Sequence, residues 1–175
     1  MQFEQLVEKM GRPLARHEWH QHPNGGGWIH QSSAVAVTAI VSMFAVVGER
    51  CIIAHNCVIM NGTKIGDGTT IGGYTKIGGG TTIGGYTTIG GYTTIGNGTT
   101  IGGCTKIGDS TKIGGGTTIG NGTTIGIGTT IGGCTKIGDS TKIGDGTTIG
   151  NGTEYPSSDT EQNQTDPTDN PKATK

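Results

Sequence analysis

An apolar residue recurs at every sixth position from Ile29 to Ile149, without one insertion or deletion. These positions, called anchors below, define 21 consecutive hexads. A small residue, most often threonine, stands two positions before each anchor, and glycine follows most anchors. A short period kept over so long a stretch is typical of a solenoid, in which each repeat packs only on its neighbours. The hexads therefore predict a solenoid rather than a globular domain.

The composition agrees with this prediction. Glycine accounts for 36 of the 175 residues and only 5% are aromatic, which leaves few large side chains for an ordinary core. Collagen is also rich in glycine, but it needs glycine at every third position and far more proline than the 5 residues present.

One hexad predicts a short strand followed by a corner. In the strand Thr81 to Ile83, alternate side chains point to opposite sides, so Thr81 and Ile83 face inward and Thr82 faces outward. We expect Gly84 and Gly85 to make the corner, because glycine tolerates positive φ. A strand this short is not stable alone, but stacked copies pair their backbones and pack isoleucine on isoleucine.

The hexads resemble those of the hexapeptide-repeat family, whose fold is a left-handed parallel β-helix with three hexads in each triangular coil. The resemblance covers Ile29 to Gly152 and implies an all-β solenoid of about seven coils. The opening HPNGGGWIHQSSAVAVTAIV is also similar to the start of hexapeptide-repeat proteins of phages and prophages. We expect an N-terminal helix and cap over 1–28, the β-helix over 29–152, and a polar, disordered tail without an anchor over 153–175.

The N-terminal segment predicts a short helix. Its apolar residues fall at helical spacing from Phe3 to Met10, and Gly11 and Pro13 end the pattern. A solenoid needs its open end covered, so this helix is interpreted as a cap, with docking to another protein as the alternative.

The outward positions of the first coils are apolar, whereas later coils carry threonine or lysine there. These positions are Trp28, Ala34, Ile40, Val46, Ile52 and Val58. Apolar side chains on an outer face need a cover, which is either the N-terminal arm or another subunit. The resemblance implies trimers, and we expect self-association with Trp28, Ile40, Val46, Ile52 and Val58 as interface residues.

The stretch IIAHNC, from Ile52 to Cys57, is the candidate catalytic motif. It resembles the His-Asp-Cys or His-Asn-Cys hexad of acyltransferases with this fold, such as the lipid A acyltransferases and sialic acid O-acetyltransferases. In those enzymes the corner histidine is the general base toward a substrate hydroxyl. The resemblance implies that His55 is this base and that acyl-CoA is the donor.

Three histidines lie close together in the sequence at His17, His20 and His22. Imidazoles bind zinc or nickel, and the γ-class carbonic anhydrases have this fold, but their ligands lie on the coils. This cluster precedes the coils, so we predict no metal site and interpret it as a solvated linker.

The four cysteines predict free thiols. Cys51 and Cys57 occupy the small inward position, where cysteine packs as a small apolar residue. Cys104 and Cys134 are five hexads apart, which places them on different corners of a three-hexad coil and prevents a disulfide. Free thiols are typical of a reducing compartment.

The outward threonines raise ice binding as a further alternative, because some antifreeze proteins display rows of threonine on flat β-helices. With three hexads to a coil, one row contains Thr82, Thr100 and Thr118, but Lys64 and Lys136 interrupt it at its two ends.

Charge and hydropathy narrow the functional classes. The 12 Lys and Arg residues nearly balance the 13 Asp and Glu residues, so nothing favours nucleic acid as a partner. No apolar run is long enough to cross a bilayer, and the N-terminus lacks a secretion signal. We therefore expect a cytoplasmic protein, or a virion protein if a phage encodes it. The main interpretation is a non-enzymatic rigid rod without a cofactor that assembles through its N-terminal coils, and acyl transfer at His55 is the alternative.

Overall fold

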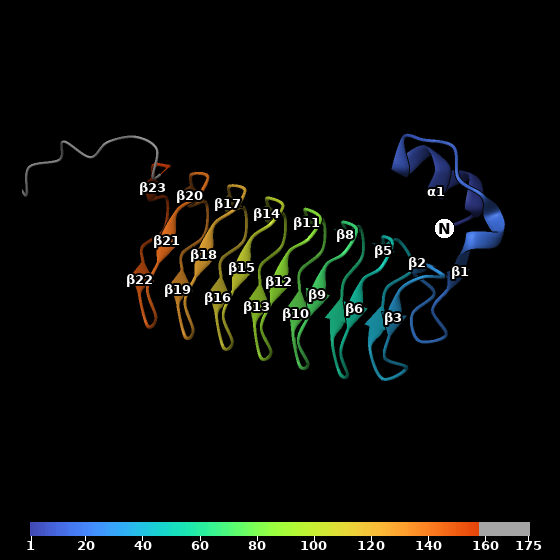
Figure 1. Ribbon diagram of the computed structural model, residues 1–175, viewed down its shortest axis with the longest axis horizontal. Coiled ribbons are helices and arrows are strands. Elements are labelled where there is room, and N and C mark those ends of the chain that lie inside the picture. The colour runs from blue at the N-terminus through green and yellow to red at the C-terminus, as the bar shows by residue number, and fades with distance from the viewer. Residues whose placement is uncertain (158–175) are drawn as a thin grey trace, which may run out of the picture.

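The structure is a computed structural model that describes residues 1–157. Figure 1 shows a rod of stacked coils with one helix, α1 (Phe3–Met10), at its N-terminal end. A short 3₁₀ helix (Arg16–Glu18) and the strand β1 (Trp19–Gln21) lead from α1 into the first coil. The solenoid of about seven turns and the short N-terminal helix confirm the predicted fold.

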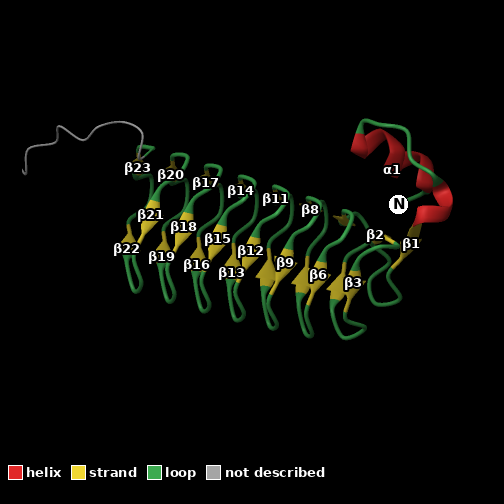
Figure 2. Cartoon of the chain, viewed as in Figure 1, coloured by secondary structure: helices red, strands yellow, loops and turns green. Residues whose placement is uncertain are grey.

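Three sheets form the faces of the rod (Figure 2). The first sheet contains, in order, β1, β2 (Trp28–His30), β5 (Val46–Val47), β8 (Lys64–Ile65), β11 (Thr82–Ile83), β14 (Thr100–Ile101), β17 (Thr118–Ile119), β20 (Lys136–Ile137) and β23 (Glu154–Tyr155). The second contains β3 (Ala34–Val35), β6 (Ile52–Ile53), β9 (Thr70–Ile71), β12 (Thr88–Ile89), β15 (Lys106–Ile107), β18 (Thr124–Ile125) and β21 (Lys142–Ile143). The third contains β4 (Ile40–Val41), β7 (Val58–Ile59), β10 (Lys76–Ile77), β13 (Thr94–Ile95), β16 (Lys112–Ile113), β19 (Thr130–Ile131) and β22 (Thr148–Ile149).

Each strand of a coil pairs with the strand 18 residues away in the next coil. Thr82 lies beside Lys64 on one side and beside Thr100 on the other, and the three sheets repeat this parallel pairing. This confirms the predicted outward row of Lys64, Thr82, Thr100, Thr118 and Lys136. Only β1 breaks the pattern, since it pairs antiparallel with β2.

The core is a column of anchors and small inward residues. The isoleucine anchors are buried, and so are the threonines two positions before them, such as Thr81 and Thr87. Each of these hydroxyls donates to a glycine carbonyl 15 residues further along, as from Thr81 Oγ1 to Gly96 O at 3.2 Å. A buried hydroxyl without a partner would cost free energy, so this bond explains why threonine is accepted in the core.

The corners contain glycine for a reason that differs from the prediction. Positive φ falls on the third residue after the anchor, such as Tyr86 (φ 57°), and not on Gly84 or Gly85. Gly84 is required because a Cβ there would overlap the backbone nitrogen of Gly103 and lie 2.7 Å from the carbonyl carbon of Gly102. The first corner glycine thus permits close stacking of coils rather than an unusual dihedral angle.

Asparagine and aspartate side chains tie successive corners together. Asn97 Oδ1 accepts a hydrogen bond from Gly79 N at 2.8 Å, and Asp109 Oδ1 accepts one from Gly91 N at 2.7 Å. Each bond satisfies a backbone amide in the preceding coil, which explains why these residues recur in the turns.

The repeat extends one hexad further than predicted. Strand β23 pairs with β20, and Tyr155 lies opposite Ile137 where the next anchor would be. Glu154 also forms an ion pair with Lys136 at 2.9 Å, which raises the pKa of this lysine. The expectation of a tail without an anchor from 153 is therefore wrong for 153–155. The predicted disorder of 158–175 lies outside the described residues.

The N-terminal arm covers the start of the first sheet. Phe3 and Leu6 of α1 pack with Trp28 and Val46, and the rings of Phe3 and Trp28 meet edge to face at 5.6 Å. Lys9 Nζ donates to the carbonyl oxygens of Phe44 and Gly62 in the first coils, and burial lowers the pKa of Lys9. The arm is therefore a packed part of the solenoid.

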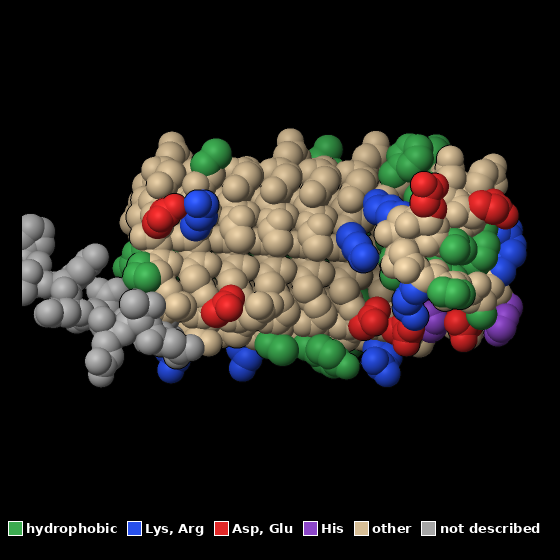
Figure 3. Space-filling model, turned by 90° about the horizontal axis from the view of Figure 1, so that it is seen from above, with side chains coloured by type: hydrophobic (Ala, Val, Ile, Leu, Met, Phe, Trp, Pro, Cys, Tyr) green, Lys and Arg blue, Asp and Glu red, His purple; other side chains and the backbone are tan. Residues whose placement is uncertain are grey.

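The arm answers half of the question raised by the apolar outer positions. Trp28 and Val46 are buried beneath it, so they are not available to another subunit in this arrangement. Ile40 and Ile52 remain exposed, and Val58 is half-buried. Figure 3, which views the rod from the side of the first sheet, shows the arm at one end and scattered charges of both signs along the rest. Among residues 1–157, no helix has the length and apolarity needed to cross a membrane.

Candidate functional site

His55 lies at the corner between the second and third sheets, in the turn that joins β6 to β7. Its side chain is exposed, and Asn56 beside it has the left-handed φ of 57°. The Asn56 backbone nitrogen donates to Thr38 Oγ1 in the preceding coil at 3.2 Å. This confirms that the histidine occupies a corner, as the hexad pattern predicts.

The imidazole is oriented by its neighbours on one side. Its Nδ1 lies 3.4 Å from the amide nitrogen of Asn56, and its ring meets Tyr74 edge to face at 5.0 Å. The Tyr74 backbone nitrogen also donates to the His55 carbonyl oxygen at 3.1 Å. Within residues 1–157, Nε2 of His55 has no hydrogen-bond partner, so it is the atom that can exchange a proton with a bound molecule.

Apolar side chains surround this corner on the side away from Tyr74. Val37 occupies the same corner position one coil earlier and is 75% exposed. Ile52 and Ile40, on the neighbouring strands of the second and third sheets, are 54% and 39% exposed. We call these three residues the open apolar surface. His55 therefore lies at the edge of an uncovered apolar area.

The cysteine of the motif has a structural role. Cys57 is buried, and its Sγ donates to the Gly72 carbonyl oxygen at 3.1 Å, while Cys51 does the same to Gly66. Burial raises the pKa of both thiols, so they stay protonated and are poor nucleophiles. Cys104 and Cys134 are exposed and free.

The three N-terminal histidines do not come together as a ligand set. His17 and His20 are exposed, whereas His22 is buried with Nδ1 3.1 Å from the Asn24 carbonyl oxygen. His20 and His22 line a cavity of about 200 Å³ at the N-terminal end of the rod. Within residues 1–157, no three His, Cys, Asp or Glu side chains are placed to hold a metal ion.

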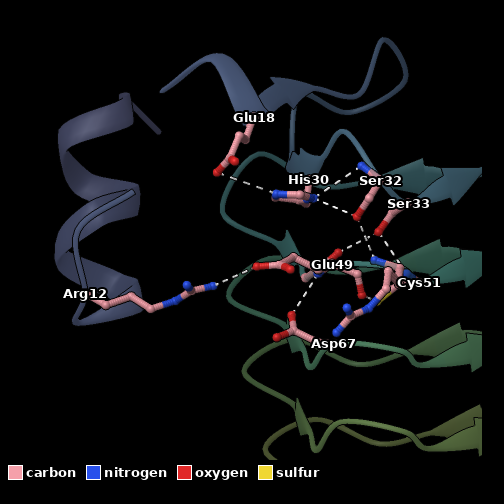
Figure 4. A network of polar contacts seen from close by, with 10 residues as sticks. Arg12, Glu18, His30, Ser32, Ser33, Glu49, Cys51 and Asp67 are labelled. Carbon is pink, nitrogen blue, oxygen red and sulfur yellow. Dashed lines mark hydrogen bonds and ion pairs between the residues drawn. The ribbon is translucent and has the colours of Figure 1, made fainter. Parts of the chain in front are cut away.

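A polar network near the arm was not predicted from the sequence (Figure 4). Arg12 pairs with Glu49 at 3.3 Å, and the Glu49 backbone nitrogen donates to Asp67 at 2.8 Å. His30 is buried, with Nδ1 2.8 Å from Ser32 Oγ and Nε2 3.8 Å from Glu18. Because these groups satisfy one another, the network fixes the arm to the first coils rather than forming an open site.

The tyrosines beside His55 were also missed, although the sequence carried a signal. Tyr74 and Tyr92 are 18 residues apart, which is one coil, so the hexad pattern alone places them on one corner. The structure stacks their rings at 5.0 Å with an interplanar angle of 7°. Tyr86, 12 residues after Tyr74, lies on a different corner.

The family model described as bacterial transferase hexapeptide (six repeats) matches residues 44–79, 86–121 and 116–151, which together make up more than half of the chain. The chain belongs to the hexapeptide transferase family. The left-handed form of the helix, expected from the resemblance, accompanies this membership. No curated protein matches the sequence.

Solved structures of hexapeptide proteins share the fold at low identity. A proposed acetyltransferase from Bacillus cereus is 16% identical with a TM-score of 0.51, and the match covers 74% of this chain and 73% of that one. The UDP-N-acetylglucosamine acyltransferase of Francisella novicida is 22% identical with a TM-score of 0.51, covering 65% of this chain and 55% of that one. This hexapeptide protein thus spans little more than half the length of the Francisella enzyme.

Proposed function

We propose that this hexapeptide protein is an acyltransferase in which His55 is the general base. The observation that carries the proposal is the placement of His55: its Nδ1 side is held by Asn56 and Tyr74, its Nε2 is open, and an apolar surface adjoins it. Membership of the transferase family supports the same conclusion. This reverses the order of the two sequence interpretations, in which the rigid rod came first.

The proposed reaction transfers an acyl group from acyl-CoA to a hydroxyl or amine. Nε2 of His55 takes the proton of the acceptor while its oxygen or nitrogen attacks the thioester carbonyl carbon. The new C–O or C–N bond forms, the C–S bond breaks, and the departing CoA thiolate takes the proton back from the imidazolium. Cys57 takes no part, because its buried thiol faces a backbone carbonyl. The cytoplasm, where acyl-CoA is made, is the compartment that this reaction requires.

The test is release of CoA thiol from acetyl-CoA in the presence of a panel of sugar and amine acceptors. His55→Ala is expected to lower kcat/KM by about 100-fold, the usual contribution of a positioned general base. His20→Ala, at another exposed histidine, is the matched control and should leave the rate unchanged. Equal rates for the wild type and His55→Ala, or no binding of acetyl-CoA at millimolar concentration, would contradict the proposal.

We further propose that the working form is a trimer assembled through the open apolar surface. A lone chain offers His55 no enclosing wall, and the exposed Ile40 and Ile52 flank the same corner. Burying this surface against another copy would remove it from water and place each His55 beside a subunit boundary. Trp28 and Val46 serve instead to seat the arm within each chain.

Light scattering on a size-exclusion column is expected to give the mass of three 17.8 kDa chains. Ile40→Asp combined with Ile52→Asp should shift this mass to that of a monomer, because a charge would be buried at the contact. Thr88→Asp, at the same outward position of the second sheet two coils later, should leave the trimer intact. A monodisperse wild-type monomer would refute the assembly.

The rigid rod without catalysis stays as the second candidate. The coils from Lys64 onward favour it, because their outward residues are only threonine and lysine up to Thr148. A phage origin and a virion location belong to this candidate, and ice binding by the threonine rows stays a weaker prediction. Assembly of the wild type without any acyl-CoA binding would favour the rod.

A further inference from the structure

Two tyrosines form an exposed column at the corner that also carries His55. Tyr74 is 49% exposed and Tyr92 is 66% exposed, and their rings are stacked. Tyr74 is covered by His55 on one side and by Tyr92 on the other, whereas Tyr92 contacts an aromatic ring on one side only. The difference in exposure follows from this arrangement, and Tyr92 is the open end of the column.

The backbone at these tyrosines is one that favours glycine. Tyr74 and Tyr92 have φ of 59° and 57°, in the left-handed region that side chains with a Cβ rarely adopt. Further along the same corner this position is filled by Gly128 and Gly146. Glycine would fold more easily at both places, so the fold alone does not account for the tyrosines. Backbone strain of this kind concentrates at functional sites.

The next two turns of this corner leave the outer face of Tyr92 accessible. The turn formed by Asp109 and Ser110 is bonded directly to that of Tyr92, from Ser110 N to Gly91 O at 2.9 Å and from Gly91 N to Asp109 Oδ1 at 2.7 Å. Ser110 is too small to cover a phenol ring. One coil further, Ile127 is 55% exposed at a position that elsewhere holds glycine, asparagine or aspartate in the later coils. The corner thus presents an aromatic ring, a polar turn and an aliphatic side chain in sequence.

We propose that Tyr92, Asp109 and Ile127 form a binding site for a saccharide chain that lies along this corner. A pyranose ring has an apolar C–H face, which suits the face of Tyr92, and hydroxyls on its edges, which suit a carboxylate acceptor. Asp109 Oδ1 is occupied by Gly91 N, and its second oxygen can accept from a sugar hydroxyl. A nucleotide also stacks on tyrosine, but its phosphates would be repelled by Asp109. The site is separate from His55 and does not depend on acyl transfer.

The experiment is a titration of the full chain with chitotetraose, followed by two-dimensional amide NMR. The wild type is expected to show saturable shifts at the turns of Tyr92 and Asp109. Tyr92→Gly should weaken binding by about tenfold, as expected for one lost stacking contact. This variant should fold, because glycine occupies the same corner position at Gly128.

Two further variants make the test specific. Tyr86→Gly is the matched control, because Tyr86 is 65% exposed with φ of 57° in an equivalent turn on another corner, and its loss should leave affinity unchanged. Asp109→Asn keeps the amide acceptor, as Asn97 and Asn121 show, and should weaken binding several-fold through loss of the charge.

The outcomes separate this site from the proposed enzyme. Saccharide binding that persists in His55→Ala supports the site whether or not the protein turns over acyl-CoA. No saturable shifts in the wild type, an equal loss in Tyr86→Gly, or shifts at Tyr92 with ATP but not with chitotetraose would overturn it.

Discussion

Gly84→Ala is expected to destabilise the rod by about 3 kcal/mol or more, the upper range for overpacking in a rigid interior. The added Cβ would overlap the backbone nitrogen of Gly103 and lie 2.7 Å from its Cα. A flexible side chain could move aside, but here the neighbour is the backbone of the next coil, whose position is fixed by parallel pairing. Urea denaturation followed by far-UV circular dichroism measures the change in the free energy of unfolding.

Gly80→Ala is the control for this prediction, because it tests the dihedral angle without the contact. Gly80 has φ of 68° and its Cβ would meet nothing within 4 Å. Its expected cost is about 1–2 kcal/mol, the usual penalty for a left-handed residue with a Cβ. If Gly80→Ala proved as damaging as Gly84→Ala, the close stacking of coils would not be what requires the first corner glycine.

Ile101→Ala is expected to lower the free energy of unfolding by about 2–5 kcal/mol, because it removes a fully buried side chain from the middle of the column. The cavity would be bounded by Ile83 and Ile119, which pair with it on either side. Neither neighbour can collapse into the space without breaking its own strand. The same denaturation experiment measures the loss.

Ile149→Ala should cost clearly less, and this difference tests the one-dimensional character of the stability. Ile149 is already 5% exposed, and its strand β22 is an edge strand that pairs only with β19 among the described residues. A defect there loosens one end, whereas a defect at Ile101 separates two halves of the rod. Equal losses at both positions would point to a single cooperative unit without local opening.

The hexad pattern predicted the fold because period, face and partner are all set by one rule. A fixed six-residue step with three steps to a coil decides which residues pair, so the row containing Thr82 and Thr100 could be written down in advance. The pattern failed at Tyr155, where the anchor is aromatic and the outward residue is acidic. It also placed glycine correctly in the corner but for the wrong reason, since coil-to-coil contact cannot be inferred from one hexad.

The candidate site could be predicted only in part. The motif at His55 was visible in the sequence, and so was the apolar character of Ile40 and Ile52. What covers Trp28 depends on where α1 docks, and no short-range pattern encodes that. The network of Arg12, Glu49 and His30 joins residues that are distant in the sequence, so their pairing required the structure.

The 18-residue coil also limits how a gene for such a protein can change length. The segment Thr99–Gly122 recurs at Thr129–Gly152 with one difference, a displacement of 30 residues. Since 30 is not a multiple of 18, the copy of Asp109 is Asp139, on the corner between the first and second sheets. Unequal recombination in steps of 18 would lengthen the rod and keep each corner feature in line. Steps of six or twelve would lengthen it equally well and turn everything downstream by a third or two thirds of a rotation, so the alignment of His55 with Tyr74 and Tyr92 records which insertions between them were tolerated.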